Sequence, residues 1–443
     1  MEDVSSFWLC ATLAGDAALF NSVASTAAPS VNGDYNTDYT HTDLEGLGGI
    51  EKKLSEKDVS PDVVEWDGPA DPECPRNWKP VRKFFFTVIT SSVILAVSFG
   101  SSVFAPATAV TAAQFGVSPI VMQLSVTLWI LGLAVGPILF GPLSEVFGHL
   151  IPFSVTVLGL AAFQLPVALA ENVPTILIGR FLAGAFGSGS YSIVSGQYYE
   201  LYDLTLRGSE ETPVELEDIV HKYLTKPVRM FATEPILVIF TAYLTLVYGT
   251  LYLAFQAFPL AYRQRGWSAT ASELPFVAVM LGIMSACGIC SLFALTWYKA
   301  RVSQNKTAPQ PEWRLPPMAL GAVILPPALL WFGWSGNVHW ISQVIASYFI
   351  GLGLQLIFIA GITYIVDVYR ESANSAMSIH VVVRSLIASS FPLFATEMYE
   401  QLGVAWASSV LALLSLIMAP APLLFWVYGS RIRSWSHFSS TLD

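Results

Sequence analysis

The sequence predicts an all-α polytopic membrane protein. Of its 443 residues, 54% are hydrophobic and only 12% are charged, and the mean hydropathy is +0.56. Soluble globular domains carry about 25% charged residues, so this composition excludes that class. The apolar residues also fall into long runs, and about 20 apolar residues are enough for one helix to cross a bilayer.

The net charge of −10 lies in the first part of the chain. Residues 1–79 contain 15 Asp and Glu but only 5 Lys and Arg, so the remainder is close to neutral. This segment is polar between residues 22 and 56 and has no periodic apolar face, which predicts a disordered acidic tail. The short apolar stretch 7–13 has no basic residue before it, so we expect no cleaved signal peptide.

Each long apolar run is interpreted as one membrane-spanning helix, because irregular backbone cannot be exposed to lipid. The ten runs cover residues 84–105, 121–141, 150–170, 174–198, 235–256, 273–297, 316–334, 340–366, 374–395 and 403–428. Short connections rich in Gly, Pro and Asn separate several of them and predict antiparallel neighbours. The expected bundle therefore has four helices followed by six.

Basic residues determine the expected orientation, because short loops rich in Lys and Arg stay in the cytoplasm. One set of alternate connections holds nearly all of them: Arg82, Lys83, Arg207, Lys222, Lys226, Arg229, Lys299, Arg301, Lys306, Arg314, Arg370, Arg431 and Arg433. The other set holds Arg263 and Arg265 with several acidic residues. Both termini are therefore expected in the cytoplasm. The glycosylation triplet Asn305-Lys306-Thr307 falls on that side and should remain unmodified.

This topology divides the chain into five expected regions. They are a cytoplasmic N-terminal tail, a four-span N-terminal bundle, a cytoplasmic central loop, a six-span C-terminal bundle and a cytoplasmic C-terminal tail. Their ranges are 1–79, 80–200, 201–232, 233–430 and 431–443.

The most informative motif runs from Gly141 to Pro152, between the second and third spans. It is expected to form a turn pinned by Gly141 and Gly148 on the cytoplasmic face. There Glu145 can accept hydrogen bonds from helix N-terminal amides and pair with basic groups as helices move. We interpret these three residues as a conformational latch. An ordinary turn that contains one acid is the alternative.

Arg180 lies well within the fourth span. A guanidinium inside the membrane costs at least about 3 kcal/mol on insertion scales, so the first interpretation is a functional role facing the bundle interior. Coupling of proton or substrate movement is the role we expect. A purely structural ion pair is the alternative.

Arg384 is a second arginine within a span, and His380 precedes it by one helical turn. Both could line a water-filled cavity and couple substrate or proton movement. They also lie toward the cytoplasmic half, so Arg384 could instead extend to the membrane surface. The sequence leaves these two interpretations open.

Aromatic residues could stack on an apolar ligand. Among them we take Tyr252 and Tyr364, with the amide of Gln256, as tentative cavity contacts. Core packing or an interface belt is the alternative for each aromatic residue. Gly132 and Gly136 have the G-x-x-x-G spacing that lets two helix backbones approach closely, which is general membrane packing.

No catalytic or metal-binding pattern is present in the sequence. The six histidines show no H-E-x-x-H spacing, no G-x-S-x-G occurs, and no nucleotide-binding domain follows the spans. We therefore expect no enzymatic activity, no metal and no cofactor. An ion gradient is the energy source that this leaves for transport.

Several short segments carry a family resemblance: residues 65–78, 141–152, 179–187, 257–259, 266–268, 311–317, 331–334, 384–385 and 391–394. Together they resemble the fungal drug:proton antiporters of the major facilitator superfamily, in the branch that contains polyamine and multidrug exporters. The resemblance covers residues 65 to about 433. It implies that Arg180 corresponds to the fourth-helix arginine implicated in proton movement.

The chain departs from this family in three ways. The superfamily usually has twelve spans, and the similarity of Arg207-Gly208 and Lys226–Arg229 to loop ends implies that helices five and six are missing. His149-Leu150 stands where the branch often has two arginines, which weakens the expected latch. Gln256 stands where many relatives have an acid, and a neutral amide cannot carry a proton.

The resemblance implies a transporter that works by alternating access of a central cavity. Its expected function is proton-coupled efflux of small apolar or amphipathic compounds, such as a drug, a toxin or a secondary metabolite. Protons, the substrate and the lipid bilayer are the expected partners, with no nucleic acid, and we expect a monomer in the plasma membrane. The alternative is a transport-incompetent truncated paralogue or the product of an incorrectly spliced gene.

Overall fold

The computed structural model describes residues 77–105, 107–202, 225–268, 270–304, 310–369 and 372–434, together with Ser436 and Phe438. Every regular element within these ranges is a helix. The expected N-terminal tail falls almost wholly outside the described residues. The same is true of most of the central loop and of the triplet at Asn305.

The N-terminal half contains four long helices: α3 (Pro80–Ser102), α5 (Pro119–Val146), α6 (Leu150–Ala168) and α7 (Val173–Tyr202). A short helix, α4 (Thr108–Phe115), occupies the connection between α3 and α5, where only a turn was expected. Gly116 ends α4 with φ 64°, a conformation that glycine adopts without steric cost. Proline in the first turn starts both α3 and α5, because its missing N–H is not needed there.

The C-terminal half begins with α9 (Lys226–Thr233), a short helix inside the range expected to be the central loop. The long helices that follow are α10 (Pro235–Arg263), α11 (Phe276–Phe293), α13 (Pro316–Trp334) and α14 (Trp340–Val368). One turn of π-helix, Ala294–Tyr298, joins α11 directly to α12 (Lys299–Gln304). The sixth span is therefore longer than its apolar run.

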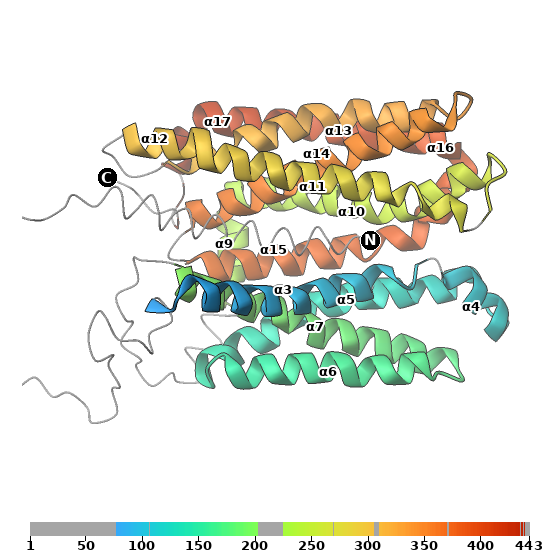
Figure 1. Cartoon of the computed structure of the whole chain (residues 1–443), viewed down its shortest axis with the longest axis horizontal. Coiled ribbons are helices and arrows are strands. Elements are labelled where there is room, and N and C mark those ends of the chain that lie inside the picture. Colours follow the sequence, from blue (N-terminus) through green and yellow to red (C-terminus); the bar gives the residue numbers. More distant parts are fainter. Residues whose placement is uncertain are drawn as a thin grey trace, which may run out of the picture.

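The last part of the chain contains α15 (Ala373–Ala388), α16 (Phe391–Met418) and α17 (Pro420–Arg433). Gly403 interrupts α16 with φ 74°, and the chain reverses its direction there (Figure 1). The two passes on either side of Gly403 correspond to the two final apolar runs. The C-terminal bundle extends three residues beyond its expected end, to Arg433.

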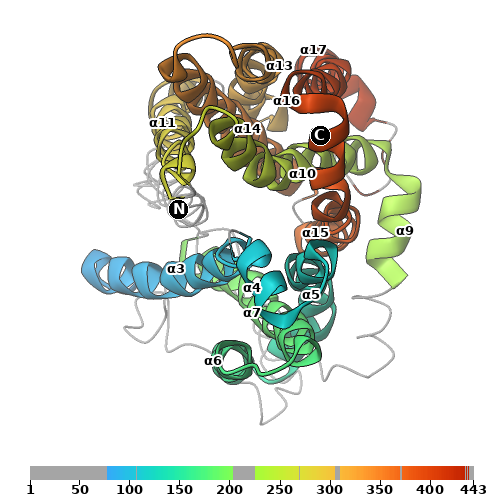
Figure 2. The same ribbon diagram turned by 90° about the vertical axis from the view of Figure 1, so that its right-hand side faces the viewer.

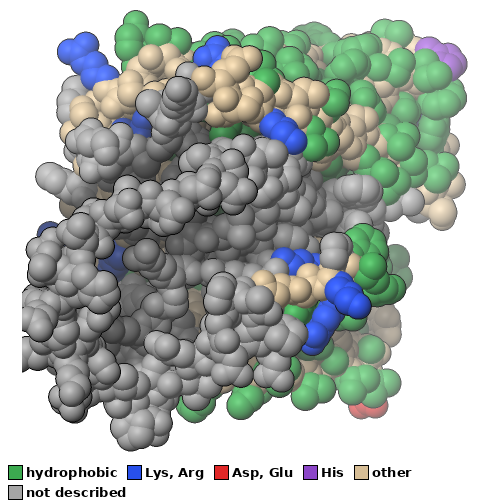
Figure 3. Space-filling model, turned by 60° about the vertical axis from the view of Figure 1, so that its left-hand side comes forward, with side chains coloured by type: hydrophobic (Ala, Val, Ile, Leu, Met, Phe, Trp, Pro, Cys, Tyr) green, Lys and Arg blue, Asp and Glu red, His purple; other side chains and the backbone are tan. Residues whose placement is uncertain are grey.

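Eight helical stretches among the described residues are long and apolar enough to cross a membrane. The last of them, Ser375–Arg433, has 59 residues and contains the reversal at Gly403. With α7 added, and with two passes in this last stretch, the helices make the ten passes that the sequence predicts. Hydrophobic side chains cover most of the visible side of these helices (Figure 3), as expected for a surface that faces lipid.

The two ends of the bundle differ in the elements that they contain. We call them the α9 end, with α9, α12 and the start of α3, and the α4 end, with α4 and the short 3₁₀ helix Ala271–Glu273 (Figure 1). The beginning of α3 and the last turn of α17 both lie at the α9 end. An even number of passes brings both ends of the described chain to the same side.

The two halves meet mainly through α5 and α15. Figure 2 shows α15 between α5 and α10, and α5 packs on both α15 and α16. Among the described residues, no comparably extensive contact joins α3 to α11 on the opposite side. The halves are therefore joined along one side, and the space between them lies beside this contact.

Candidate functional site

A cavity of about 710 Å³ lies between the two halves, toward the α4 end. The N-terminal half contributes residues of α3, α4 and α5, and the C-terminal half contributes residues of α10, α11, α14 and α16. Ligand pockets of small molecules have volumes of about 300–1,000 Å³. The cavity is thus large enough for one small organic molecule.

The walls of this cavity are aromatic and aliphatic with a few amides. Phe99 of α3, Phe255 of α10 and Phe276 of α11 lie on three sides, and the Phe255 and Phe276 rings are 5.4 Å apart. Gln123 and Gln256 add polar groups from opposite halves. Small-molecule sites usually have apolar walls that contain only a few polar groups. The structure therefore places Gln256, one of the three tentative cavity residues, in the cavity lining.

Charged residues gather at the α4 end of the cavity. Glu273, Glu397 and Glu400 line it together with Arg263. The Gln401 amide donates a hydrogen bond to Glu397. The three carboxylates outnumber the one guanidinium, so the cavity is acidic at this end. We call the part lined by these four residues the acidic mouth.

Beside the cavity, Tyr252 of α10 contacts the N-terminal half. Tyr252 is 4% exposed and packs against Val126 and Ile130 of α5. Its hydroxyl lies 3.1 Å from the Tyr248 hydroxyl and donates to Ser101 Oγ of α3 at 3.4 Å. Tyr252 therefore does not line the cavity but bonds α10 to α3 across the two halves.

Arg180 is buried, with 1% of its surface exposed. Its guanidinium donates to the carbonyl oxygens of Gly100 at 2.5 Å, Ser101 at 3.3 Å and Ser125 at 3.3 Å. The first two carbonyls belong to the last turn of α3, where backbone acceptors lack helical partners and the helix dipole is negative. No described carboxylate pairs with it. Arg180 thus joins α7 to α3 and α5 through their backbones, and the ion pair considered for it is absent from the described residues.

Arg384 lies on α15 with its guanidinium 4.4 Å from the ring centre of Tyr248 and 5.1 Å from that of Phe358. Tyr248 is near the middle of the 29-residue helix α10, so Arg384 does not extend to the membrane surface. One turn earlier, His380 is fully buried and its Nδ1 lies 3.2 Å from Thr241 Oγ1. Arg384 and His380 are therefore placed inside the bundle and outside the lining of the cavity.

Tyr364 does not line the cavity. Its side chain is 0% exposed and stacks on Phe240 at 4.6 Å, with Phe425 beside both rings. This cluster belongs to the packed core of the C-terminal half, because α10, α14 and α17 converge there. The packing alternative that the sequence allowed for Tyr364 is the one observed.

The turn between α5 and α6 is shorter than the motif that predicts it. Gly141 and Glu145 lie in the final turns of α5, Pro152 lies inside α6, and only Phe147, Gly148 and His149 form the turn. The residue at position 148 has φ 70°, a conformation that glycine adopts without steric cost, which explains why a glycine stands there. The side chain of Glu145 is outside the described part of the structure.

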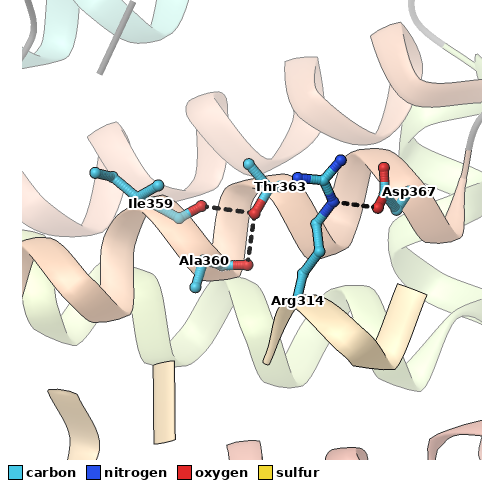
Figure 4. A network of polar contacts seen from close by, with 5 residues as sticks. All are labelled: Arg314, Ile359, Ala360, Thr363 and Asp367. Carbon is cyan, nitrogen blue, oxygen red and sulfur yellow. Dashed lines mark hydrogen bonds and ion pairs between the residues drawn. The ribbon is translucent and has the colours of Figure 1, made fainter. Parts of the chain in front are cut away.

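Polar contacts at the α9 end were not predicted from the sequence. Arg314, just before α13, bonds Asp367 on α14 at 2.5 Å, beside a Thr363 hydroxyl that donates to the carbonyls of Ile359 and Ala360 (Figure 4). This pair joins the start of one helix to the end of the next.

Arg433 makes a second, bidentate pair with Glu312, at 2.7 and 3.0 Å. It ties the end of α17 to the short 3₁₀ helix Pro311–Arg314. The Cβ atom of any residue larger than glycine at 429 would lie 2.5 Å from Glu312 Cγ, so Gly429 makes room for this carboxylate.

Glu234 is a third unpredicted residue at this end. It is fully buried and accepts hydrogen bonds from Tyr369 Oη, Ser436 Oγ and the backbone N–H of Phe438. Burial raises the pKa of Tyr369, as does the neighbouring Glu234 carboxylate, so the phenol stays protonated and donates. The sequence signal was an acid directly before Pro235, at the start of an apolar run, but nothing in the sequence identified its partners.

Comparison with known proteins gives one consistent family. A sequence model of the major facilitator superfamily matches residues 90–209. The chain is 34% identical over 497 residues to the citrinin biosynthesis cluster MFS transporter mrr1 of Monascus ruber, with 92% of this chain and 99% of that protein covered. It is 35% identical over 465 residues to the ascochitine biosynthesis cluster MFS transporter of Didymella fabae, with 86% and 90% covered.

A solved structure shares the fold. The proton:xylose symporter XylE bound to 6-bromo-6-deoxy-D-glucose has a TM-score of 0.53 at 12% identity, and the match covers 79% of this chain and 96% of that chain. The described residues form helical passes in two halves with a cavity between them, and the relatives are MFS transporters, so the class is a multi-pass membrane transporter rather than an enzyme. The chain belongs to the major facilitator superfamily.

Proposed function

We propose that the protein exports small apolar or amphipathic compounds from the cell by alternating access, driven by inward proton movement. The cavity between the halves carries this proposal, because both halves line it and it lies toward the α4 end only. Such an arrangement is one of the two states that alternating access requires. The names of the relatives, which place two of them in biosynthesis clusters for citrinin and ascochitine, favour a secondary metabolite as substrate.

Export also requires the α4 end to face outward. The positions of Lys and Arg support this, since Lys299 and Arg301 on α12 lie at the α9 end, where the positive-inside rule expects the cytoplasm. We propose the plasma membrane as the location, both termini in the cytoplasm and a monomer as the working unit.

Within this scheme the residues have separate roles. We propose Gln256 as a contact of the substrate, because it lines the cavity. Arg384 would couple substrate movement to the relative motion of the halves, since α15 lies between them. Gly141, Glu145 and Gly148 would act as the conformational latch at the α9 end, where Gly148 sets the turn between α5 and α6.

Drug accumulation in cells tests the proposal. Cells that lack their own exporters should accumulate less of at least one dye from a panel of different charge (cationic rhodamine 6G, neutral Nile red and anionic fluorescein) when they produce the full chain, and a protonophore should remove the difference. Gln256→Trp should restore accumulation by filling the cavity, whereas Gln304→Trp, at an exposed position of α12, should not. Equal accumulation with and without the chain, across a broad panel of compounds, would reject export.

A transport-incompetent form is the second candidate. The match to the Monascus ruber protein extends over 497 residues, although this chain has 443, so that relative contains segments without a counterpart here. This difference supports our proposal that helices five and six of the usual twelve are absent. Sequencing the transcript across the codons around Gly208 would show whether the gene encodes a further segment there. A longer transcript would assign the short chain to incorrect splicing.

A further inference from the structure

Arg384 has five N–H donors and makes no hydrogen bond with them. No described acceptor bonds its guanidinium, and its Nε is buried without a partner. Its contacts are instead the faces of two rings, Tyr248 at 4.4 Å and Phe358 at 5.1 Å. These contacts neutralise little of its charge and leave its planar set of donors available.

Arg180, the other arginine inside the bundle, does not leave its donors unbonded in this way. Arg180 is held by three backbone carbonyls, so its donors are occupied. Arg384 has neither carbonyls nor a carboxylate, since the ion pairs among the described residues join Arg314 to Asp367 and Arg433 to Glu312. Arg384 can therefore take an anion that no described residue supplies.

The surroundings of Arg384 favour an aromatic anion. The Tyr248 ring lies beside the Tyr252 ring at 5.1 Å and the Phe358 ring at 6.2 Å, so three rings converge on this position. The Tyr252 hydroxyl reaches Ser101 of the other half, which places the group where the halves meet. An arginine beside aromatic faces matches a flat molecule with a carboxylate or phenolate.

The side-chain charge changes from positive at Arg384 to mainly negative in the cavity toward the α4 end. Arg384 contacts Tyr248, which precedes the cavity-lining residue Leu251 by about one helical turn on the α9 side. The cavity itself is lined by Glu273, Glu397 and Glu400 with the single Arg263. An anion that left Arg384 for the cavity would meet a mouth of its own sign. Such a mouth hinders rebinding from that side.

We propose that Arg384 is the substrate-binding group for an aromatic organic anion, and that the acidic mouth directs the anion's release at the α4 end. This inference rests on the proposed function, because it assigns the substrate class of the same transport path. In the state open at the α9 end, the anion pairs with the Arg384 guanidinium between the Tyr248 and Phe358 rings. When the halves rock, it faces the carboxylates and leaves.

Binding to the purified full chain in nanodiscs tests the charge preference, because both faces of the protein are accessible there. The probes are 2-naphthoate, neutral 2-naphthalenemethanol and cationic 2-naphthylmethylammonium. The wild type should bind 2-naphthoate about tenfold more tightly than the neutral alcohol, since a charge-assisted bidentate bond is the stronger interaction. Equal affinity for the three probes would overturn the proposal.

Variants assign the preference to Arg384. Arg384→Gln should weaken 2-naphthoate binding about tenfold and leave the alcohol unchanged, and Arg384→Lys should keep part of the preference because its charge remains. Arg431→Gln, at an exposed position on α17, is the matched control. Full retention of the preference in Arg384→Gln would overturn the proposal. If that variant does not fold, the Arg384→Lys protein and the wild-type probe series still decide.

The outcome is separable from that of the proposed function. Export in cells of rhodamine 6G, a cation, or Nile red, which is neutral, together with no charge preference in nanodiscs, would reject the anion site and keep the exporter. Charge-selective binding without any change of accumulation in cells would keep the site and reject export.

Discussion

At the scale of single residues, Arg180 fits both a functional role that faces the bundle interior and a structural role that holds helices together. Its charge inside a membrane predicted a functional group facing the interior, and it does face the interior. Its partners are two carbonyls in the last turn of α3 and one carbonyl of α5. These acceptors belong to the backbone, and the sequence does not show which backbone groups lie near Arg180. This arrangement supports a positioning role, in which Arg180 holds three helices of the N-terminal half together.

The thermal stability of Arg180 variants tests this role. Arg180→Met should lower the unfolding midpoint strongly, because it leaves the last carbonyls of α3 without donors, and each bond to a charged group contributes about 1.5–3 kcal/mol. Arg180→Lys should be intermediate, since one ammonium cannot reach all three carbonyls in the geometry of a guanidinium. Fluorescence-detected size-exclusion chromatography after heating measures the midpoint.

The control for this series is Arg431→Gln, an exposed position on α17. It should leave the midpoint unchanged. An Arg180→Met protein as stable as the wild type, with reduced transport, would instead assign Arg180 to proton or substrate coupling.

At the scale of the elements, the contact of α5 with α7 depends on glycine. A Cβ atom at Gly132 would lie 2.7 Å from the Ala185 N atom and against the Phe181 carbonyl, and one at Gly136 would lie 2.7 Å from the Ala185 carbonyl. Neighbouring backbone atoms cannot move aside as a flexible side chain can. The G-x-x-x-G spacing therefore predicted a close helix contact correctly, but which helix lies opposite was decided by the fold.

Gly132→Ala should separate α5 from α7. Overpacking of this kind costs about 1–3 kcal/mol, more than the roughly 1 kcal/mol of helix propensity that alanine contributes. Gly288→Ala on α11 is the matched control, because nothing lies within 4 Å of its Cβ position. Thermal midpoints in detergent would show a loss for the first variant and no loss for the second. The same midpoint for both would mean that the close approach does not contribute to stability.

At the scale of the whole molecule, the two ends of the bundle carry different chemistry. The α4 end has the cavity with its acidic mouth, and the α9 end has the Arg314–Asp367 and Glu312–Arg433 pairs. Both pairs join elements within the C-terminal half, so they stiffen that half and do not bridge it to the N-terminal half. Contact between the halves depends instead on α5 with α15 and on the contacts of Tyr252 with α5 and α3.

Accessibility to a membrane-impermeant maleimide tests this orientation in intact cells. Thr396→Cys, which lines the cavity at the α4 end, should react from outside. Ser303→Cys, equally exposed but on α12 at the α9 end, should react only after the membrane is permeabilised. Both substitutions are made in a chain whose Cys10 and Cys74 are replaced by serine, and the remaining Cys287 and Cys290 are buried and should contribute little labelling. The reverse pattern would show that the bundle is inserted in the opposite direction.

The sequence predicted the helical passes well because a bilayer imposes one simple rule, an apolar run of sufficient length for each helix. The differences are at the ends of the helices. The segment 108–115 forms α4 and the segment 226–233 forms α9, since short helices between spans have no apolar run of their own. The turn after α5 has three residues, fewer than the expected Gly141–Pro152, because Gly141 and Glu145 still belong to the helix.

The candidate site was less predictable than the fold. Gln256 was assigned to the cavity and lies there, whereas Tyr364 packs in the core of the C-terminal half. Both are polar or aromatic residues within apolar runs, and only the rotation of each helix separates a lining residue from a packed one. The acids Glu273, Glu397 and Glu400 come together from different elements, so no local pattern joins them.

The sequence by itself determined that this protein is a multi-pass helical membrane protein and where the passes of the described residues lie. It also identified the charged residues whose burial in a membrane costs enough free energy to require a structural or functional explanation. Those properties depend on hydropathy and charge, which each residue carries wherever it lies. The tertiary structure alone decided that Arg180 bonds backbone carbonyls while Arg384 keeps its donors open. Partners of a charge are set by the packing of helices distant in the chain, and no single segment encodes that packing.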